Sequence, residues 1–140
     1  MRWSAAFLLA LYLVLVARLT LADPSSGRLV FAFADAVATR LSAGRLEWSE
    51  TEVLANIALF VPAGFLLAVV LGRPMLSMVV CVLGAACIEL AQQRFLPSRV
   101  PSRADVEHNG LGGLFGALLA WPFAARWARM PEDQKQPMVA

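Results

Sequence analysis

Apolar runs separated by short polar segments form the main pattern of this chain. They cover residues 3–22, 53–71, 75–94 and 103–126, and the last run carries polar residues and glycines near its start. Each run is long enough, as an α-helix, to cross a hydrocarbon core of about 30 Å. The pattern therefore predicts an all-α membrane protein, a bundle of four transmembrane helices.

The first run has a rival interpretation as a signal peptide. Arg2 precedes it, and a Leu-Thr-Leu-Ala sequence ends it. Its apolar part is longer than the ~7–15 residues of a signal-peptide core. We therefore expect a retained first span, with Arg18 near its far end extending toward the membrane interface.

The segment between the first two spans is mixed in character. Within residues 28–42 the apolar side chains recur at helical spacing, which predicts an amphipathic helix lying in the membrane interface. Residues 130–140 are polar and are expected to form a disordered tail. A single domain is then expected over residues 1–129.

Small residues predict how the helices pack. Gly72-Arg73-Pro74 has the composition of a tight turn, so the second and third spans are expected to form an antiparallel hairpin. Gly64 lies in the second span, and Gly112 and Gly116 form a Gly-x-x-x-Gly motif in the fourth. Because small residues let helix backbones approach closely, these three glycines are assigned to helix packing.

Composition agrees with a membrane location. The chain has 140 residues, 59% of them hydrophobic and 16% charged, and its mean hydropathy is +0.66. Eleven of the twelve basic residues are Arg, and they are dispersed at the ends of apolar segments. That placement is typical of membrane anchoring and topology, and it argues against a nucleic-acid partner.

The cysteines indicate no redox or metal chemistry. Cys81 and Cys87 are six residues apart in one apolar run, so on a helix they point to different faces. Neither belongs to a Cys-x-x-Cys pair. Both are interpreted as small hydrophobic residues, and we expect no metal and no cofactor.

Four spans place both chain termini on one side of the membrane. Five basic residues fall on that side and six on the other. Those on the terminus side lie in short segments close to the spans, whereas the first loop is long, and proximity to a span is what determines orientation. We therefore expect cytoplasmic termini.

Polar residues gather at the ends of the third and fourth spans. Glu89 and Gln92 lie three apart near the end of the third, and Asp105 lies on one stripe of the fourth, with Ser102 as a capping-box-like start. The up-and-down order brings the start of the second span to the same side. The predicted pocket, either ligand-binding or structural, comprises Asn56, Glu89, Gln92, Arg99, Asp105 and Asn109.

These residues resemble the motifs of the VanZ-like family. The similarity covers residues 53–120 and includes the run from Asn56 to Gly64, the pair Glu89-x-x-Gln92, and a later block. The residues of this chain that match the later block are Arg99, Asp105, Asn109, Gly112 and Gly116. The resemblance implies a small multi-spanning bacterial membrane protein. The family is named for a protein that confers low-level resistance to teicoplanin, a glycopeptide with a lipid tail.

The resemblance carries over no catalytic residue, and this chain departs from the family pattern in places. Glu107 and His108 replace residues that are usually apolar, and Gly110 stands where Thr is common. His108 has no second nitrogen ligand at metal-site spacing, so a polar first-turn residue is the better interpretation.

Two interpretations of the central acid remain open. Glu89 is either a structural acid bonded to Arg99, Asn109 or Gln92, or a proton-carrying or ligand-binding acid. Arg99, in turn, either pairs with Asp105 or binds an anionic head group.

The corresponding functions come from different classes. The first is a non-enzymatic envelope factor that binds or shields a lipid head group or lipid-tailed compound, with the tail on the apolar faces of spans two and four. The second is a membrane enzyme acting on a lipid-linked substrate, with Glu89 or Asp105 as acid or base. The enzyme ranks lower because no nucleophile is evident. A proton-coupled transporter would need internal repeats, and the sequence has none.

Overall fold

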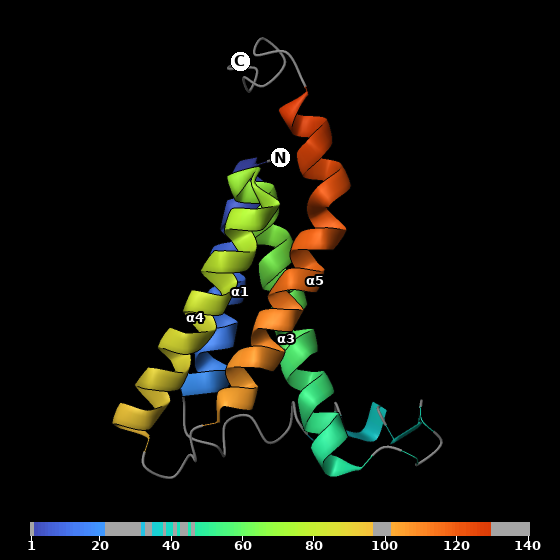
Figure 1. Cartoon of the computed structure of the whole chain (residues 1–140), viewed down its shortest axis with the longest axis vertical. Helices are drawn as coiled ribbons and strands as arrows, with labels where there is room; N and C mark the ends of the chain where they lie inside the picture. The colour runs from blue at the N-terminus through green and yellow to red at the C-terminus, as the bar shows by residue number, and fades with distance from the viewer. Residues whose placement is uncertain are drawn as a thin grey trace.

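The structure is a computed structural model. It describes residues 2–21, 32, 35–37, 39–40, 42, 45, 47–96 and 102–129. Within these residues all regular secondary structure is helical, which confirms the predicted class. The helices are α1 (Arg2–Leu21), α3 (Trp48–Leu71), α4 (Pro74–Phe95) and α5 (Arg103–Ala128) (Figure 1).

Three of the four helices are long and apolar enough to cross a membrane. They are α1, α3 from Ser49 onward, and α4. α5 has 26 residues but is less apolar, because its first half carries charged residues, Asn109 and several glycines. The interfacial helix predicted within 28–42 falls mostly outside the described residues, and the predicted tail at 130–140 lies wholly outside them.

α3 begins earlier than its apolar run predicts. The backbone N–H of Glu47 donates to Glu50 Oε2 at 3.0 Å, and the N–H of Thr51 donates to the Glu47 carbonyl at 3.0 Å. These bonds start the helix in a polar segment that hydropathy does not detect. The helix ends at Gly72, whose φ of 64° is the left-handed conformation that favours glycine.

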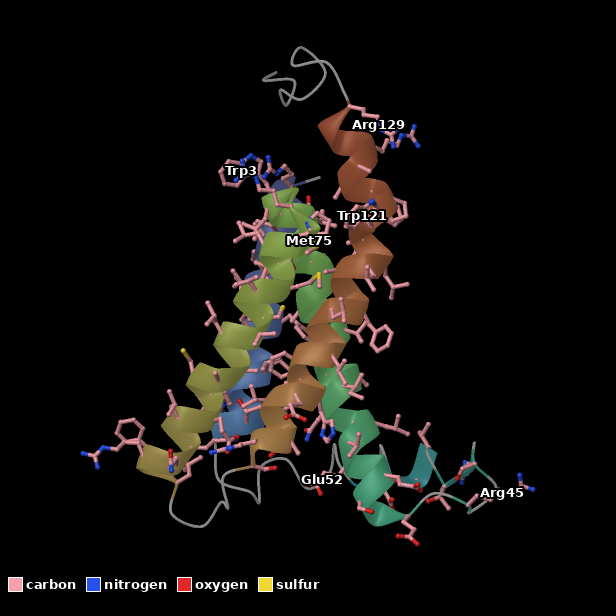
Figure 2. All side chains as sticks on the ribbon, in the orientation of Figure 1. Trp3, Arg45, Glu52, Met75, Trp121 and Arg129 are labelled. Atoms are coloured by element: carbon pink, nitrogen blue, oxygen red, sulfur yellow. The ribbon has the colours of Figure 1, made fainter. Side chains whose placement is uncertain are left out.

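α3 lies at the centre of the bundle. It packs along α5 over much of its length, against α1, and against α4, with which it forms the predicted hairpin. α1 and α4 contact each other only over a short stretch. Trp3, Met75, Trp121 and Arg129 lie at one end of the molecule, and Arg45 and Glu52 lie at the other (Figure 2).

The contact between α3 and α5 is a contact between backbones. A Cβ atom on Gly112 would lie 2.1 Å from the Ile57 carbonyl oxygen, and one on Gly116 would lie 2.0 Å from that of Val61. The Cβ of a residue replacing Gly64 would lie 2.2 Å from the carbonyl oxygen of Gly113. The three glycines predicted to pack therefore all lie where a side chain would overlap main-chain atoms.

Two small apolar clusters fill the bundle. One contains Ala68, Ala117 and Ala120 and lies toward the chain termini. The other contains Val16, Phe60 and Ala85, with partly buried residues from all four helices around it. This second cluster lies one helical turn from the polar residues at the opposite end, so it forms the floor of the candidate site.

Candidate functional site

The first polar contact of the site joins α3 to α5. Asn56 Nδ2 donates to Asp105 Oδ1 at 3.2 Å, and both residues are half-buried. Asp105 lies in the first turn of α5, where the helix dipole favours an acid. The bond therefore fixes the start of α5 against the polar face of α3.

The second contact joins α4 to the residue that precedes α5. Glu89 Oε1 accepts the backbone N–H of Ser102 at 2.6 Å. The N–H groups at a helix start have no intrahelical acceptor, so a carboxylate from another helix can bind one of them. Glu89 thus caps α5, a partner that was absent from the predicted set of Arg99, Asn109 and Gln92.

This contact corrects the capping box predicted between Ser102 and Asp105. In such a box the acid three residues into the helix accepts the N–H of the cap residue. Here that N–H is bound by Glu89, and the Asp105 carboxylate accepts from Asn56 instead. Two different helices thus bind the two groups of the expected box: Glu89 of α4 accepts the cap N–H, and Asn56 of α3 donates to Asp105.

The third contact joins α4 to α1. Gln92 Nε2 donates to the Thr20 carbonyl oxygen at 2.8 Å, and both residues are buried. Glu89 and Gln92 were predicted to point to the same side, yet they serve different helices. Residues three apart on a helix differ by about 60° in direction, which is enough to reach two neighbours. The polar residues therefore form three separate pairs.

Asn109 lies one turn beyond Asp105 on α5. Its side chain is 8% exposed, and its Oδ1 has no hydrogen-bond partner among the described residues. A buried carbonyl oxygen without a donor costs about 1–3 kcal/mol. Arg99 lies outside the described residues.

An apolar cavity of about 150 Å³ lies deeper in the bundle than the polar residues, none of which lines it. It contains Phe60, one turn from Asn56, and Ile88, the neighbour of Glu89. The cavity therefore begins about one turn deeper in the bundle than the polar groups and extends further away from them. Its walls come from α1, α3 and α4, and the remaining lining residues are Leu9, Leu13, Val16, Ala63, Leu67, Val80, Cys81 and Gly84.

The position of this cavity differs from the position predicted for a lipid tail. The tail was expected on the apolar faces of spans two and four, which correspond to α3 and α5. These helices are in backbone contact at Gly64, Gly112 and Gly116. That contact leaves no room between them, and the free volume lies on the other side of α3.

Some polar contacts were missed by sequence reasoning. Ser77 is fully buried and its Oγ donates to the Gly64 carbonyl at 2.9 Å. The signal was a stripe of small residues, Ser77, Cys81 and Ala85, at four-residue spacing on α4. Tyr12 Oη donates to the Leu59 carbonyl at 2.7 Å and holds α1 on α3.

Most of the described polar residues of the site form hydrogen bonds, and they include no cluster of the kind that binds a metal ion. Across the described part of the chain, no cluster of three or more His, Cys, Asp or Glu residues could hold a metal ion. His108 is half-buried and forms none of the three polar pairs. The polar groups gather at the start of α5, and the apolar cavity lies deeper, between α1, α3 and α4.

The fold and the site together define a small helical membrane protein. The family model for VanZ/LLP1 matches residues 7–126, and the chain belongs to this family. The match extends the similarity seen in residues 53–120 into the first helix. Comparisons with curated proteins and with solved structures gave no match.

Proposed function

We propose that this protein is a non-enzymatic envelope factor that binds a lipid or lipid-tailed compound, with the head group at the start of α5. The observation that carries the proposal is the buried Oδ1 of Asn109, in the turn that follows Asp105, which has no hydrogen-bond partner among the described residues. A buried polar atom without a partner is rare in folded proteins. A bound head group supplies the missing partner.

The apolar cavity supports a lipid-tailed ligand. A cavity of 150 Å³ with apolar walls accepts a group about as large as benzene. It therefore accommodates part of an acyl chain, while the rest of the chain extends into the bilayer. Two of the cavity walls, α1 and α4, contact each other only over a short stretch, and we propose that the chain enters between them.

The proposal places α5 in the membrane as a fourth span. Its 26 residues extend about 39 Å at 1.5 Å per residue, which exceeds the thickness of the hydrocarbon core. An even number of spans then puts both termini on one side, which we propose is the cytoplasmic side of a bacterial inner membrane. The polar site faces the opposite side, where it meets head groups of the outer leaflet.

The test is the lipid that the purified full-length protein retains, measured by native mass spectrometry. Gly84→Leu fills the cavity, since a Cβ at Gly84 has no neighbour within 4 Å. Asn109→Leu removes the unpartnered oxygen. We expect both variants to lose most of the retained lipid. Val79→Leu, at an exposed position of α4, is the matched control and should retain it.

Two results would overturn the proposal. One is unchanged lipid retention by folded Gly84→Leu and Asn109→Leu. The other is conversion of the bound lipid to a product of different mass, lost in Glu89→Gln or Asp105→Asn, which would establish the enzyme alternative.

A further inference from the structure

The two ends of the bundle differ in charge. At the end where α1 begins and α5 ends, which we call the terminus end, four basic residues are exposed: Arg2, Arg73, Arg126 and Arg129. The described acidic residues lie in the first loop, at the start of α3, near the end of α4 and at the start of α5. On α4, for example, Glu89 lies about 22 Å from Pro74, at 1.5 Å per residue. Within the described part of the chain, no acid therefore neutralises the basic residues of the terminus end.

Arg2 is held in place by α3. Its Nε donates to the Val70 carbonyl oxygen at 2.9 Å, and its Nη2 donates to the same oxygen. That carbonyl is available because residue 74, four positions further on, is a proline and has no N–H. A guanidinium group has five N–H donors, so two bonds leave three for another acceptor. The Arg2 guanidinium is therefore fixed at the turn between α3 and α4 with most of its donors free.

Arg73 lies in the same turn. It is three residues beyond Val70, so the chain allows at most about 11 Å between their Cα atoms. Its side chain is exposed, and it precedes α4 without forming a side-chain cap bond. Two exposed arginines, one from α1 and one from the turn, can therefore reach a common anion, which would offset the repulsion between their charges.

Apolar side chains place this turn at the level of lipid head groups. Trp3 is 82% exposed and Met75 is 62% exposed. Both lie at the terminus end, together with Trp121 and Arg129 (Figure 2). Tryptophan is enriched where hydrocarbon meets water, and an arginine at that level extends its guanidinium toward the head groups. This position favours a phosphate of the membrane over an anion dissolved in water.

We infer that Arg2 and Arg73 bind the head group of an anionic phospholipid in the leaflet that meets the terminus end. Arginine suits a phosphodiester because its planar fork makes two parallel N–H···O bonds. Net negative charge matters because a zwitterionic lipid carries its own cation beside the phosphate. The two arginines of α5 are not assigned to the site, because the tail that follows them carries two acids outside the described residues.

The inference goes beyond the proposed function and does not depend on it. The lipid site lies at the opposite end of the bundle from Asn109, and it needs neither that residue nor the cavity. In the proposed orientation it faces the cytoplasmic leaflet, whose anionic lipids attract basic residues close to a span.

The experiment compares two lipids with the same dioleoyl chains, phosphatidylglycerol and phosphatidylcholine. Both contain a phosphodiester, but only phosphatidylglycerol has a net negative charge. The lipids compete for the full-length protein in a neutral detergent, and native mass spectrometry reads the ratio of the two bound lipids. One basic residue near a membrane surface contributes about 1 kcal/mol, which is a factor of about five. We therefore expect phosphatidylglycerol to be preferred about 25-fold when both arginines are present. A ratio close to one would overturn the inference.

Variants assign the preference to the two arginines. Arg2→Gln and Arg73→Gln should each lower the ratio about fivefold. Arg94→Gln removes an exposed charge at the other end of α4 and is the matched control, so it should keep the native ratio. Arg2→Lys keeps the charge and should keep most of the preference. If Arg2→Lys and Arg2→Gln lower the ratio equally, Arg2 acts through its bond to Val70, and its assignment to the lipid site is overturned.

Two other interpretations of these arginines predict different results. Arginines that only orient the chain act during insertion, so replacing them would leave the lipid ratio of the purified protein unchanged, which would overturn the inference. Raising the ammonium acetate concentration from about 0.05 M to about 0.5 M should weaken the preference severalfold, because exposed charges are screened. Soluble glycerophosphoglycerol has the same head group without chains and should not displace phosphatidylglycerol at equal concentration. Displacement at equal concentration would assign the arginines to a soluble anion and overturn the inference.

Discussion

Replacing Gly112 by alanine tests the closest contact in the bundle. The new Cβ would lie 2.1 Å from the Ile57 carbonyl oxygen and 2.9 Å from the Phe60 Cβ. Neither obstacle can rotate away, since one is a main-chain atom and the other is attached directly to the main chain. α5 must therefore move away from α3 by about 1 Å to restore normal contact distances.

The free-energy change has two opposing parts. Overpacking a close contact costs about 1–3 kcal/mol, and a contact with the backbone belongs at the upper end of that range. Alanine recovers up to about 1 kcal/mol, because it is a better helix former than glycine. We expect a net destabilisation of about 2 kcal/mol.

Thermal unfolding of the purified protein in a mild detergent measures this effect. A loss of about 2 kcal/mol corresponds to a melting temperature lower by roughly 5–10 °C for a chain of this size. Gly84→Ala is the matched control, because a Cβ there has no neighbour within 4 Å. It should melt at the native temperature or slightly above. If Gly112→Ala melts as Gly84→Ala does, the backbone contact between α3 and α5 is refuted.

The polar contacts make three further changes informative. Glu89→Leu should lower stability by about 1–3 kcal/mol because it leaves a backbone N–H unpaired. Glu89→Gln keeps an acceptor and should have a smaller effect. If both variants melted at the native temperature, the capping role of Glu89 would be contradicted. Gln92→Glu places a carboxylate against a carbonyl oxygen and should lower the melting temperature, whereas Gln93→Glu, at the exposed neighbouring position, should not. If Gln93→Glu lowered the melting temperature more than Gln92→Glu did, the bond between α1 and α4 would be excluded. In a cysteine-free background, Arg45→Cys and Arg129→Cys should react with an impermeant maleimide from opposite sides of the membrane, and labelling from one side would exclude four spans (Figure 2).

The helices could be predicted because apolar runs of this length have few alternatives. α1 and α4 begin and end within one or two residues of their predicted bounds. The largest error is at the start of α3, where the Glu47–Glu50 bond extends the helix into polar sequence. Hydropathy measures transfer to hydrocarbon, and it does not measure capping.

The partners within the site could be predicted only in part. Spacing places Asp105 and Asn109 on one stripe of α5, but it cannot say which polar group each will meet. The contact from Glu89 to Ser102 depends on the angle at which α4 reaches the start of α5. That angle depends on the packing of α4 and α5 against each other and against α3, which is a property of the whole bundle.

The cavity could not be predicted because empty volume has no sequence signature. Gly84 looks like any other small residue in an apolar run, yet its surroundings are open. Gly64 and Gly112 are also glycines in apolar helices, but a Cβ at either position would overlap main-chain atoms of a neighbouring helix. The distinction depends on the neighbouring helix, which a single-helix pattern does not contain.

The limited hydropathy of α5 has a consequence for how the protein is made. α1, α3 and α4 are each apolar enough to partition into lipid unaided, but α5 carries Asn109 and a row of glycines that hydrocarbon solvates poorly. In the proposed four-span arrangement, α5 follows α3 out of the ribosome, so the α3 surface that matches its glycines would already be in the bilayer. Entry of α5 would then be coupled to docking on α3, and translocation of this segment and assembly of the bundle would be one event. A chain ending at Phe95 would keep its spans, whereas α5 fused alone behind a neutral leader would pass into the aqueous phase.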